Sequence, residues 1–174
     1  MSAESPSNTE TSRCEKAPLV FIPRMEACEP DCIENYIRAM LPYFYANGIR
    51  CAIGETGETR PADLYYAPSL KETASKAFSM LQVSSMHPSA CGFRCAERIK
   101  RYREPISPGP VYISRCKNPR IRTPYPTVWD QLAGEDKEAT TLFRSCQKEL
   151  ARQTVRGICD YFSLPFQDPH SNAH

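Results

Sequence analysis

The 174-residue sequence has no long apolar run, only three histidines and no marked excess of either charge. No stretch approaches the roughly 18 consecutive apolar residues that a membrane span requires, so we expect no transmembrane segment. Lysine and arginine number 22 against 20 aspartate and glutamate residues, which leaves a net charge of +2. This balance gives no overall electrostatic field that would attract a polyanion, so we expect no nucleic-acid partner.

The amino-terminal residues also lack a targeting signal. Residues 1–13 are rich in Ser, Thr and Glu and contain no apolar segment after a basic start, unlike a secretory signal. We therefore expect the chain as written to be cytoplasmic. Residues 1–17 and 167–174 are predicted to be disordered tails. Residues 18–166 are long enough for one compact domain with a sizeable core and too short for two.

Cysteine, by contrast, is abundant, and the odd count of nine excludes a fully paired disulfide framework in a monomer. Cys28 and Cys32 are four residues apart, as are Cys91 and Cys95, so each pair would share one face of a helix. Two interpretations follow. The thiols are small buried apolar side chains, or they form a four-cysteine zinc site in a small structural or interaction module.

A basic run from Arg94 to Arg103 is the only local excess of charge. Such runs are usually solvent-exposed helix faces. The alternative is a patch that binds phosphate or teichoic acid.

The first half of the domain shows the clearest periodicity. Pro18–Ile22 is a short apolar run typical of a buried strand. Apolar residues recur at helical spacing from Glu29 to Asn47, and Gly48 stands where a helix C-cap favours a left-handed residue. Gly48–Ile53 reads as the next strand. The pattern predicts a β-α-β unit whose two strands are parallel.

The rest of the chain continues the alternation of strands and helices. Gly54–Pro61 has the composition of an exposed loop. The predicted strands are Ala62–Ala67, Val111–Ser114 and Pro126–Leu132. The predicted helices are Ser69 to about Val83, Cys95–Tyr102, and one long or two consecutive helices over Asp136–Phe162, after which Leu164, Pro165 and Phe166 pack on the core. These elements predict an α/β fold, a three-layer α/β/α domain with a largely parallel sheet.

Four segments, in order, resemble those of a known enzyme family. They are Glu34–Ile49 (ENYIRAMLPYFYANGI), Ala62–Pro68 (ADLYYAP), Arg122–Lys137 (RTPYPTVWDQLAGEDK) and Glu149–Phe166 (ELARQTVRGICDYFSLPF). They resemble segments of the zinc-dependent N-acetylmuramoyl-L-alanine amidases of spore-forming anaerobic bacteria, the AmiC and CwlC type. The resemblance implies a shortened form of that fold, because the family carries a further helix and strand where this chain has only the loop 54–61.

The resemblance also implies where the family's chemistry would lie. These amidases hold one zinc ion with two histidines and a glutamate, and a second glutamate acts as the general base. The ligand glutamate corresponds to Glu29. The first histidine has no counterpart after Ile22, and the second belongs to the missing strand, which leaves His87 as the one other candidate ligand. The catalytic glutamate corresponds to Gln131, whose neutral amide accepts no proton.

The sequence therefore indicates an amidase-like cell-wall protein that is catalytically inactive and acts by binding. Its partner would be peptidoglycan, a muramyl peptide or another cell-wall protein, reached in a sporulating mother cell or by non-classical release. Candidate binding residues, able to stack on a ligand or pair with its carboxylates, are Tyr65, Tyr66, Trp129 and Arg122. Their alternative role is packing. The rival hypothesis is an active zinc amidohydrolase that uses Glu29, His87 and a cysteine, so zinc is the cofactor if the protein is active and none is needed otherwise.

Overall fold

The structure is a computed structural model that describes most of the chain in eight stretches. These are residues 17–23, 30–55, 58–69, 79–83, 91–106, 111–114, 125–132 and 137–170. The strands are β1 (Leu19–Ile22), β2 (Arg50–Ile53), β3 (Leu64–Ser69), β4 (Ser79–Val83), β5 (Val111–Ser114) and β6 (Thr127–Gln131). The helices are α2 (Pro30–Ala46), α3 (Cys91–Arg103) and α4 (Lys137–Tyr161).

The six strands form one sheet in the order β2-β1-β3-β6-β4-β5. The first four strands of this order are mutually parallel, β4 runs antiparallel to β6, and β5 is parallel to β4. The prediction of an α/β domain with a largely parallel sheet is confirmed, including the parallel β1-α2-β2 unit. The carboxyl ends of β1, β3 and β6 therefore meet at one edge of the sheet.

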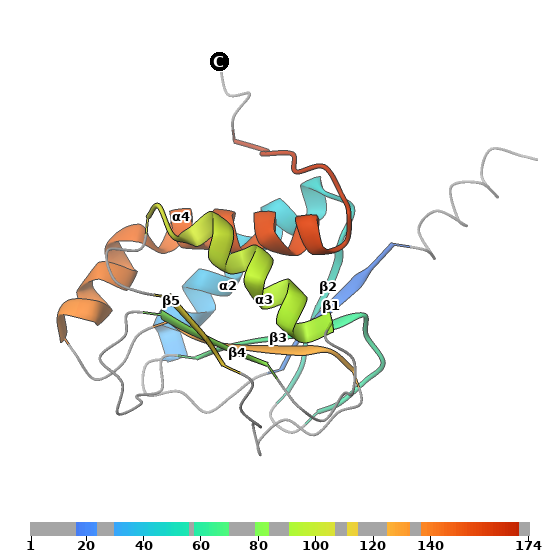
Figure 1. Cartoon of the computed structure of the whole chain (residues 1–174), viewed down its shortest axis with the longest axis horizontal. Coiled ribbons are helices and arrows are strands. Elements are labelled where there is room, and N and C mark those ends of the chain that lie inside the picture. The colour runs from blue at the N-terminus through green and yellow to red at the C-terminus, as the bar shows by residue number, and fades with distance from the viewer. Residues whose placement is uncertain are drawn as a thin grey trace, which may run out of the picture.

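All three described helices cover the same face of the sheet, as Figure 1 shows. Their apolar sides pack on the strand residues that point to this face, among them Val20, Tyr66 and Val128. Phe21, Tyr65 and Ala67 point the other way and form a second, smaller cluster. Within the described stretches, the second helical layer of the expected three-layer arrangement is therefore not present.

The helix predicted over Glu29–Asn47 is confirmed as α2, and it ends as expected. Gly48 has a φ of +72° and follows the last turn, the backbone conformation that a helix C-cap requires. A hydrogen bond from the Ile49 amide to the Phe44 carbonyl, 3.0 Å long, closes the cap. Chain reversal at this glycine brings β2 back beside β1 in parallel register.

The predicted helix from Ser69 to about Val83 is wrong at both ends, and Ser69 is the last residue of β3. Ser79–Val83 is strand β4, which pairs with β5 on one side and β6 on the other. A strand with partners on both sides gains a full set of ladder hydrogen bonds, which outweighs a modest local preference for helix. The remainder of that predicted helix, residues 70–78, lies outside the described stretches.

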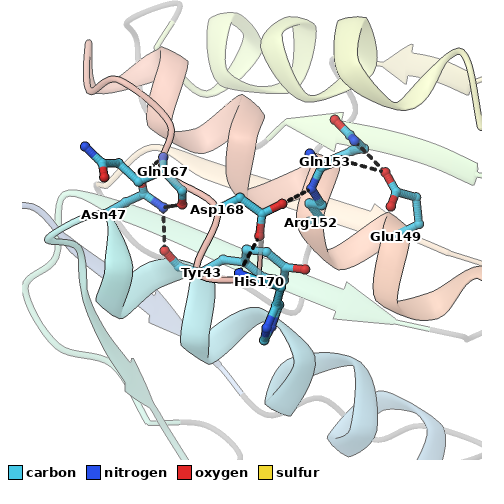
Figure 2. A network of polar contacts seen from close by, with 8 residues as sticks. All are labelled: Tyr43, Asn47, Glu149, Arg152, Gln153, Gln167, Asp168 and His170. Carbon is cyan, nitrogen blue, oxygen red and sulfur yellow. Dashed lines mark hydrogen bonds and ion pairs between the residues drawn. The ribbon is translucent and has the colours of Figure 1, made fainter. Parts of the chain in front are cut away.

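The carboxyl-terminal helix α4 is kinked, and the residues that follow it pack on the core. α4 has a non-helical residue at Cys146 (φ −115°, ψ 18°), so it consists of two helical halves joined at a kink. Leu164 and Phe166 pack on the core as predicted. The chain then continues to His170 in contact with the helices, past the expected boundary at Phe166: Asn47 exchanges two hydrogen bonds with the Gln167 backbone, of 2.6 and 2.9 Å (Figure 2).

Candidate functional site

The carboxyl edge of the parallel strands is where an α/β sheet of this kind offers its ligand site. Ile22, Ser69 and Gln131 are the last residues of β1, β3 and β6 at this edge. α2 begins shortly after β1 ends, and the irregular segment after β2 lies at the same edge. Gln131, the residue predicted to correspond to the catalytic glutamate, has its backbone paired with Ser69 and Met80. Glu29, His87 and Arg122 lie outside the described stretches.

Asp130, the neighbour of Gln131, points into the core and is completely buried. Its Oδ2 atom accepts hydrogen bonds from Arg103 Nη1, at 2.5 Å, and from the Tyr66 hydroxyl. Arg103 closes α3 and is also completely buried. Asp130 Oδ1 has no hydrogen-bond partner within the described stretches. The acidic residue next to Gln131 in the sequence is thus engaged in an internal ion pair.

Two further residues extend this ion pair into a network that joins the sheet to all three helices. The Tyr36 hydroxyl of α2 lies 3.0 Å from the Tyr66 hydroxyl and donates to Thr154 Oγ1 of α4 at 2.9 Å. Burial alone would lower the pKa of Arg103, but the Asp130 carboxylate raises it, so the guanidinium stays charged. Burial, followed by the charge of Asp130, raises the pKa of Tyr36 to about 12. We call these five residues, Tyr36, Tyr66, Arg103, Asp130 and Thr154, the buried polar network.

Alkaline pH should destabilise the fold through buried groups that must stay protonated. The pKa of Tyr36 rises from 10.0 to about 12, and burial raises the pKa of the Cys51 thiol from 9.0 to about 12. The unfolded chain loses these protons first, so stability present at pH 8 falls as the pH rises from about 9 through 12. For Tyr36 alone the loss amounts to about 3 kcal/mol at full ionisation. Urea unfolding of the reduced protein at several pH values measures it.

The matched control is Tyr36→Phe, which removes the phenol. Its free energy of unfolding should be lower at pH 8, because Thr154 and Tyr66 lose a partner, but it should fall less between pH 10 and 12 than that of the wild type. An equal fall in both proteins would contradict a buried, protonated Tyr36.

The opposite face of the sheet carries an aromatic cluster. The rings of Phe21 and Tyr65 are 4.9 Å apart, and Tyr65 stacks on Tyr125 at 5.9 Å. The Tyr65 hydroxyl donates to the Arg60 carbonyl at 2.6 Å and accepts from the Arg60 amide at 2.9 Å. Trp129 packs against this cluster and is half-buried. Its indole Nε1 has no partner within the described part of the chain.

The candidate binding residues are therefore not gathered in one place. Tyr66 is completely buried in the polar network, and Tyr65 is 1% exposed in the aromatic cluster on the other face. Neither leaves a ring face open to a ligand, so the structure gives both a packing role. Trp129 retains exposed surface two residues before Gln131, and residues two apart on a strand share a face.

The described residues do not fit a zinc site. No three His, Cys, Asp or Glu side chains within the described stretches come close enough together to hold a metal ion. Cys95, one of the four cysteines of the zinc-module hypothesis, is buried in the main core, and burial raises the pKa of its thiol. A protonated thiol packed among apolar side chains is a poor metal ligand. Cys32 and Cys91 lie in the first turns of α2 and α3, and Cys28 lies outside the described residues.

The sequence patterns did not predict that Arg103, Tyr36 and Thr154 form part of a buried polar network. Arg103 ends the basic run 94–103, where an exposed helix face was expected. That expectation fits Arg98 and Arg101, whose side chains are partly exposed. Both form ion pairs with Asp160 of α4, at 3.3 and 3.7 Å. Helical spacing does separate Arg103 from them, because Arg103 lies four residues after Ile99 and eight after Cys95, both of which are buried.

Comparison with known proteins identifies the fold. No family model and no curated protein sequence matches this chain. Solved structures do match. One is the catalytic domain of CwlV, the N-acetylmuramoyl-L-alanine amidase of Bacillus (Paenibacillus) polymyxa var. colistinus. Its TM-score is 0.62 at 13% sequence identity, and the match covers 85% of this chain and 99% of that one. The N-acetylmuramoyl-L-alanine amidase AmiC2 of Nostoc punctiforme has a TM-score of 0.59 at 13% sequence identity. This match covers 84% of this chain and 97% of that one.

A third match is the CwlD amidase of Clostridioides difficile, solved in complex with the GerS lipoprotein, with a TM-score of 0.61 at 12% identity over 84% of this chain and 98% of that one. The chain therefore has an amidase-like fold, and at these identities the likeness concerns the fold alone. No helix within the described stretches is long and apolar enough to cross a lipid bilayer.

Proposed function

We propose that this chain is an amidase-like cell-wall protein that binds muramyl peptides of peptidoglycan without cleaving them. The observation that carries the proposal is the end of β6. By the sequence resemblance, Gln131 corresponds to the catalytic glutamate of those amidases, and Asp130 beside it is buried and ion-paired with Arg103. A carboxylate locked in this way is unavailable to take a proton from an attacking water.

The fold supports a ligand of this class, because the similar solved structures are N-acetylmuramoyl-L-alanine amidases. An amidase-like sheet that keeps its carboxyl edge but loses the base retains a surface for recognition. Trp129 is the only tryptophan of the chain and lies on the strand that ends at Gln131. We propose Trp129 and Arg122 as its ligand contacts, the indole for stacking and the guanidinium for a carboxylate.

Three measurements on the full chain test this proposal. Muramyl dipeptide should change the tryptophan emission in a saturable way, and purified sacculi should retain the protein in sedimentation. Chromatography of muropeptides incubated with the protein and zinc should show no released stem peptide. Arg122→Gln should weaken retention several-fold, whereas Arg101→Gln, on the outer side of α3, should leave it unchanged.

Two outcomes would overturn the proposal. Failure to bind both sacculi and muramyl dipeptide removes the recognition function. Release of stem peptides that is abolished by Glu29→Ala replaces it with an active zinc amidohydrolase, and as-purified protein with stoichiometric zinc would support that rival.

A further inference from the structure

The carboxyl-terminal tail lies on the helical layer in the manner of a bound peptide. Residues 163–170 leave α4 without forming a helix or a strand, and they pack beside the end of α2 (Figure 2). Along this segment exposed residues alternate with partly buried ones, and the partly buried residues are Leu164, Phe166 and Asp168. Alternation with a period of two is typical of an extended chain. The side chain at every second position of the tail therefore faces the protein.

Asn47, which follows the last residue of α2, binds the backbone of the tail. Its Oδ1 atom accepts a hydrogen bond from the Gln167 amide at 2.6 Å, and its Nδ2 atom donates to the Gln167 carbonyl at 2.9 Å. Nδ2 also donates to the Tyr43 carbonyl at 2.7 Å, so α2 orients the carboxamide independently of the tail. Such a pair of bonds recognises the backbone of an extended peptide whatever its side chain, provided that the residue is not proline.

An aromatic pocket receives the Phe166 ring. The ring stacks on Tyr43 with the centroids 6.2 Å apart. The guanidinium carbons of Arg152 and Arg156 lie 5.9 and 6.0 Å from the centroid of the Phe166 ring. Cations attract an aromatic ring within about 6 Å, so this pocket favours an aromatic residue over an aliphatic one. The three pocket residues belong to α2 and α4, and none is part of the tail.

Arg152 also selects an acidic residue two positions further along the tail. Its Nε atom donates to Asp168 Oδ2 at 2.6 Å, and its Nη1 atom donates to Glu149 Oε2, within α4, at 3.1 Å (Figure 2). Arg152 is therefore held between an acid of the helix and an acid of the tail. Hydrogen bonds between charged groups are stronger than those between neutral ones. The segment that fits the groove thus carries an aromatic residue and, two positions later, an acidic one.

The tail is joined to α4 by a left-handed residue. Ser163 has a φ of 60°, a conformation that residues other than glycine rarely adopt. The Leu164 amide donates to the Cys159 carbonyl at 2.8 Å and closes the cap of α4 ahead of the groove. The helix is therefore capped without residues 165–170, and this segment can leave the groove without unwinding α4.

We propose that this groove binds an extended peptide segment of a partner protein, one with an aromatic residue followed two positions later by an acidic residue. The chain's own residues 165–170 are then an intramolecular occupant that the partner segment displaces. Backbone bonds combined with pockets for alternate side chains are how separate extended peptides are recognised. The site is independent of muramyl-peptide binding, because the 17 residues of α2 separate it by about 25 Å from the carboxyl edge of the sheet.

A fluorescein-labelled peptide of residues 163–170 (SLPFQDPH) is the probe, and its binding to the full chain is read by anisotropy. Gln167→Pro with Phe166→Ser in the protein should free the groove, because proline has no amide to donate to Asn47 and serine has no ring. This tail-freed variant should bind the probe in a saturable way. The wild type should bind it at least about tenfold more weakly, since its own tail occupies the site. A scrambled peptide should bind neither protein.

Further substitutions in the tail-freed variant test the individual contacts. Asn47→Ala should weaken binding of the probe about tenfold, for two lost hydrogen bonds. Arg152→Gln in the protein and Asp168→Asn in the probe should each weaken binding several-fold, and together no more than either alone, because the two groups interact directly. Arg98→Gln, which removes the same charge from α3, should leave the affinity unchanged.

If the tail-freed variant loses helicity by circular dichroism, the wild type serves instead. Unlabelled peptide should then speed the amide hydrogen exchange of residues 164–170 and leave that of α3 unchanged. No saturable binding and no change in exchange would overturn the proposal, as would equal binding of the scrambled peptide or equal affinity after Asn47→Ala.

Exchange of tails between two copies is the remaining outcome. A concentration-dependent dimer that Gln167→Pro abolishes would assign the groove to the tail of a second copy and would overturn the choice of a partner protein. The muramyl dipeptide titration of Trp129 should give the same result in the tail-freed variant and in the wild type, so either proposal can fail alone.

Discussion

Replacing Arg103 with methionine is expected to lower the free energy of unfolding by about 3–5 kcal/mol, because it leaves a buried carboxylate without its counterion. Arg103 and Asp130 are both completely buried, and the Arg103 guanidinium lies 2.5 Å from Asp130 Oδ2. Methionine fills much of the same volume but leaves the carboxylate with the Tyr66 hydroxyl as its partner. Urea unfolding followed by far-ultraviolet circular dichroism measures the difference.

The double variant Arg103→Met with Asp130→Leu separates the loss of an ion pair from a loss of packing. Removing both charges should recover most of the stability, because a well-packed apolar pair often equals or exceeds a buried ion pair. Arg101→Met, two residues earlier on the exposed side of α3, should change stability by less than about 0.5 kcal/mol. A double variant as unstable as Arg103→Met would show that Arg103 stabilises the fold mainly through the packing of its side chain and not through its charge.

The sequence predicted those parts of the fold that have local signals. Apolar residues at helical spacing and Gly48 after them defined α2, and the cap geometry required the glycine that is present. The short apolar run that became β1 was also recognisable, because a buried strand of a mainly parallel sheet has no polar face. The run that became β5 was recognised as a strand as well.

The strand β4 had no such signal. Its residues Ser79–Val83 favour helix about as well as strand, and their state is decided by β5 and β6, which come later in the chain. The buried polar network is non-local in the same way. Tyr36 and Thr154 are separated by 118 residues and Arg103 and Asp130 by 27, so neither contact has a sequence period.

Strand alternation explains where the candidate residues lie. Neighbouring residues of a strand point to opposite faces, and the structure places Asp130 in the main core and Trp129 in the opposite cluster. The same alternation separates Tyr65 from Tyr66. What alternation could not reveal was which face the helices cover, and therefore that Tyr66 and Asp130 would meet Arg103 in the interior.

Substituting Gly157 should be the second most damaging change, because α3 and α4 cross at this residue. A Cβ atom at position 157 would lie 2.5 Å from Ile99 Cα and 2.7 Å from Ile99 N. Alanine favours a helix over glycine by about 1 kcal/mol, which would stabilise an uncrowded position. Here the clash is with backbone, so the helices must move apart, and overpacking of this kind costs about 1–3 kcal/mol, occasionally more. We expect Gly157→Ala to destabilise the protein by about 2 kcal/mol and Gly157→Val by more.

Two controls identify backbone contact as the cause. Ile99→Ala should not rescue Gly157→Ala, since truncating the Ile99 side chain removes only the contact at 2.9 Å with Cγ1 and leaves both backbone contacts. Gly48→Ala has open space around it and should cost only about 1 kcal/mol, from its positive φ. Thermal and urea unfolding of the four variants give the comparison. If Gly157→Ala is neutral or stabilising, the gain in helix propensity exceeds the clash, and α3 and α4 are not in close backbone contact at this residue.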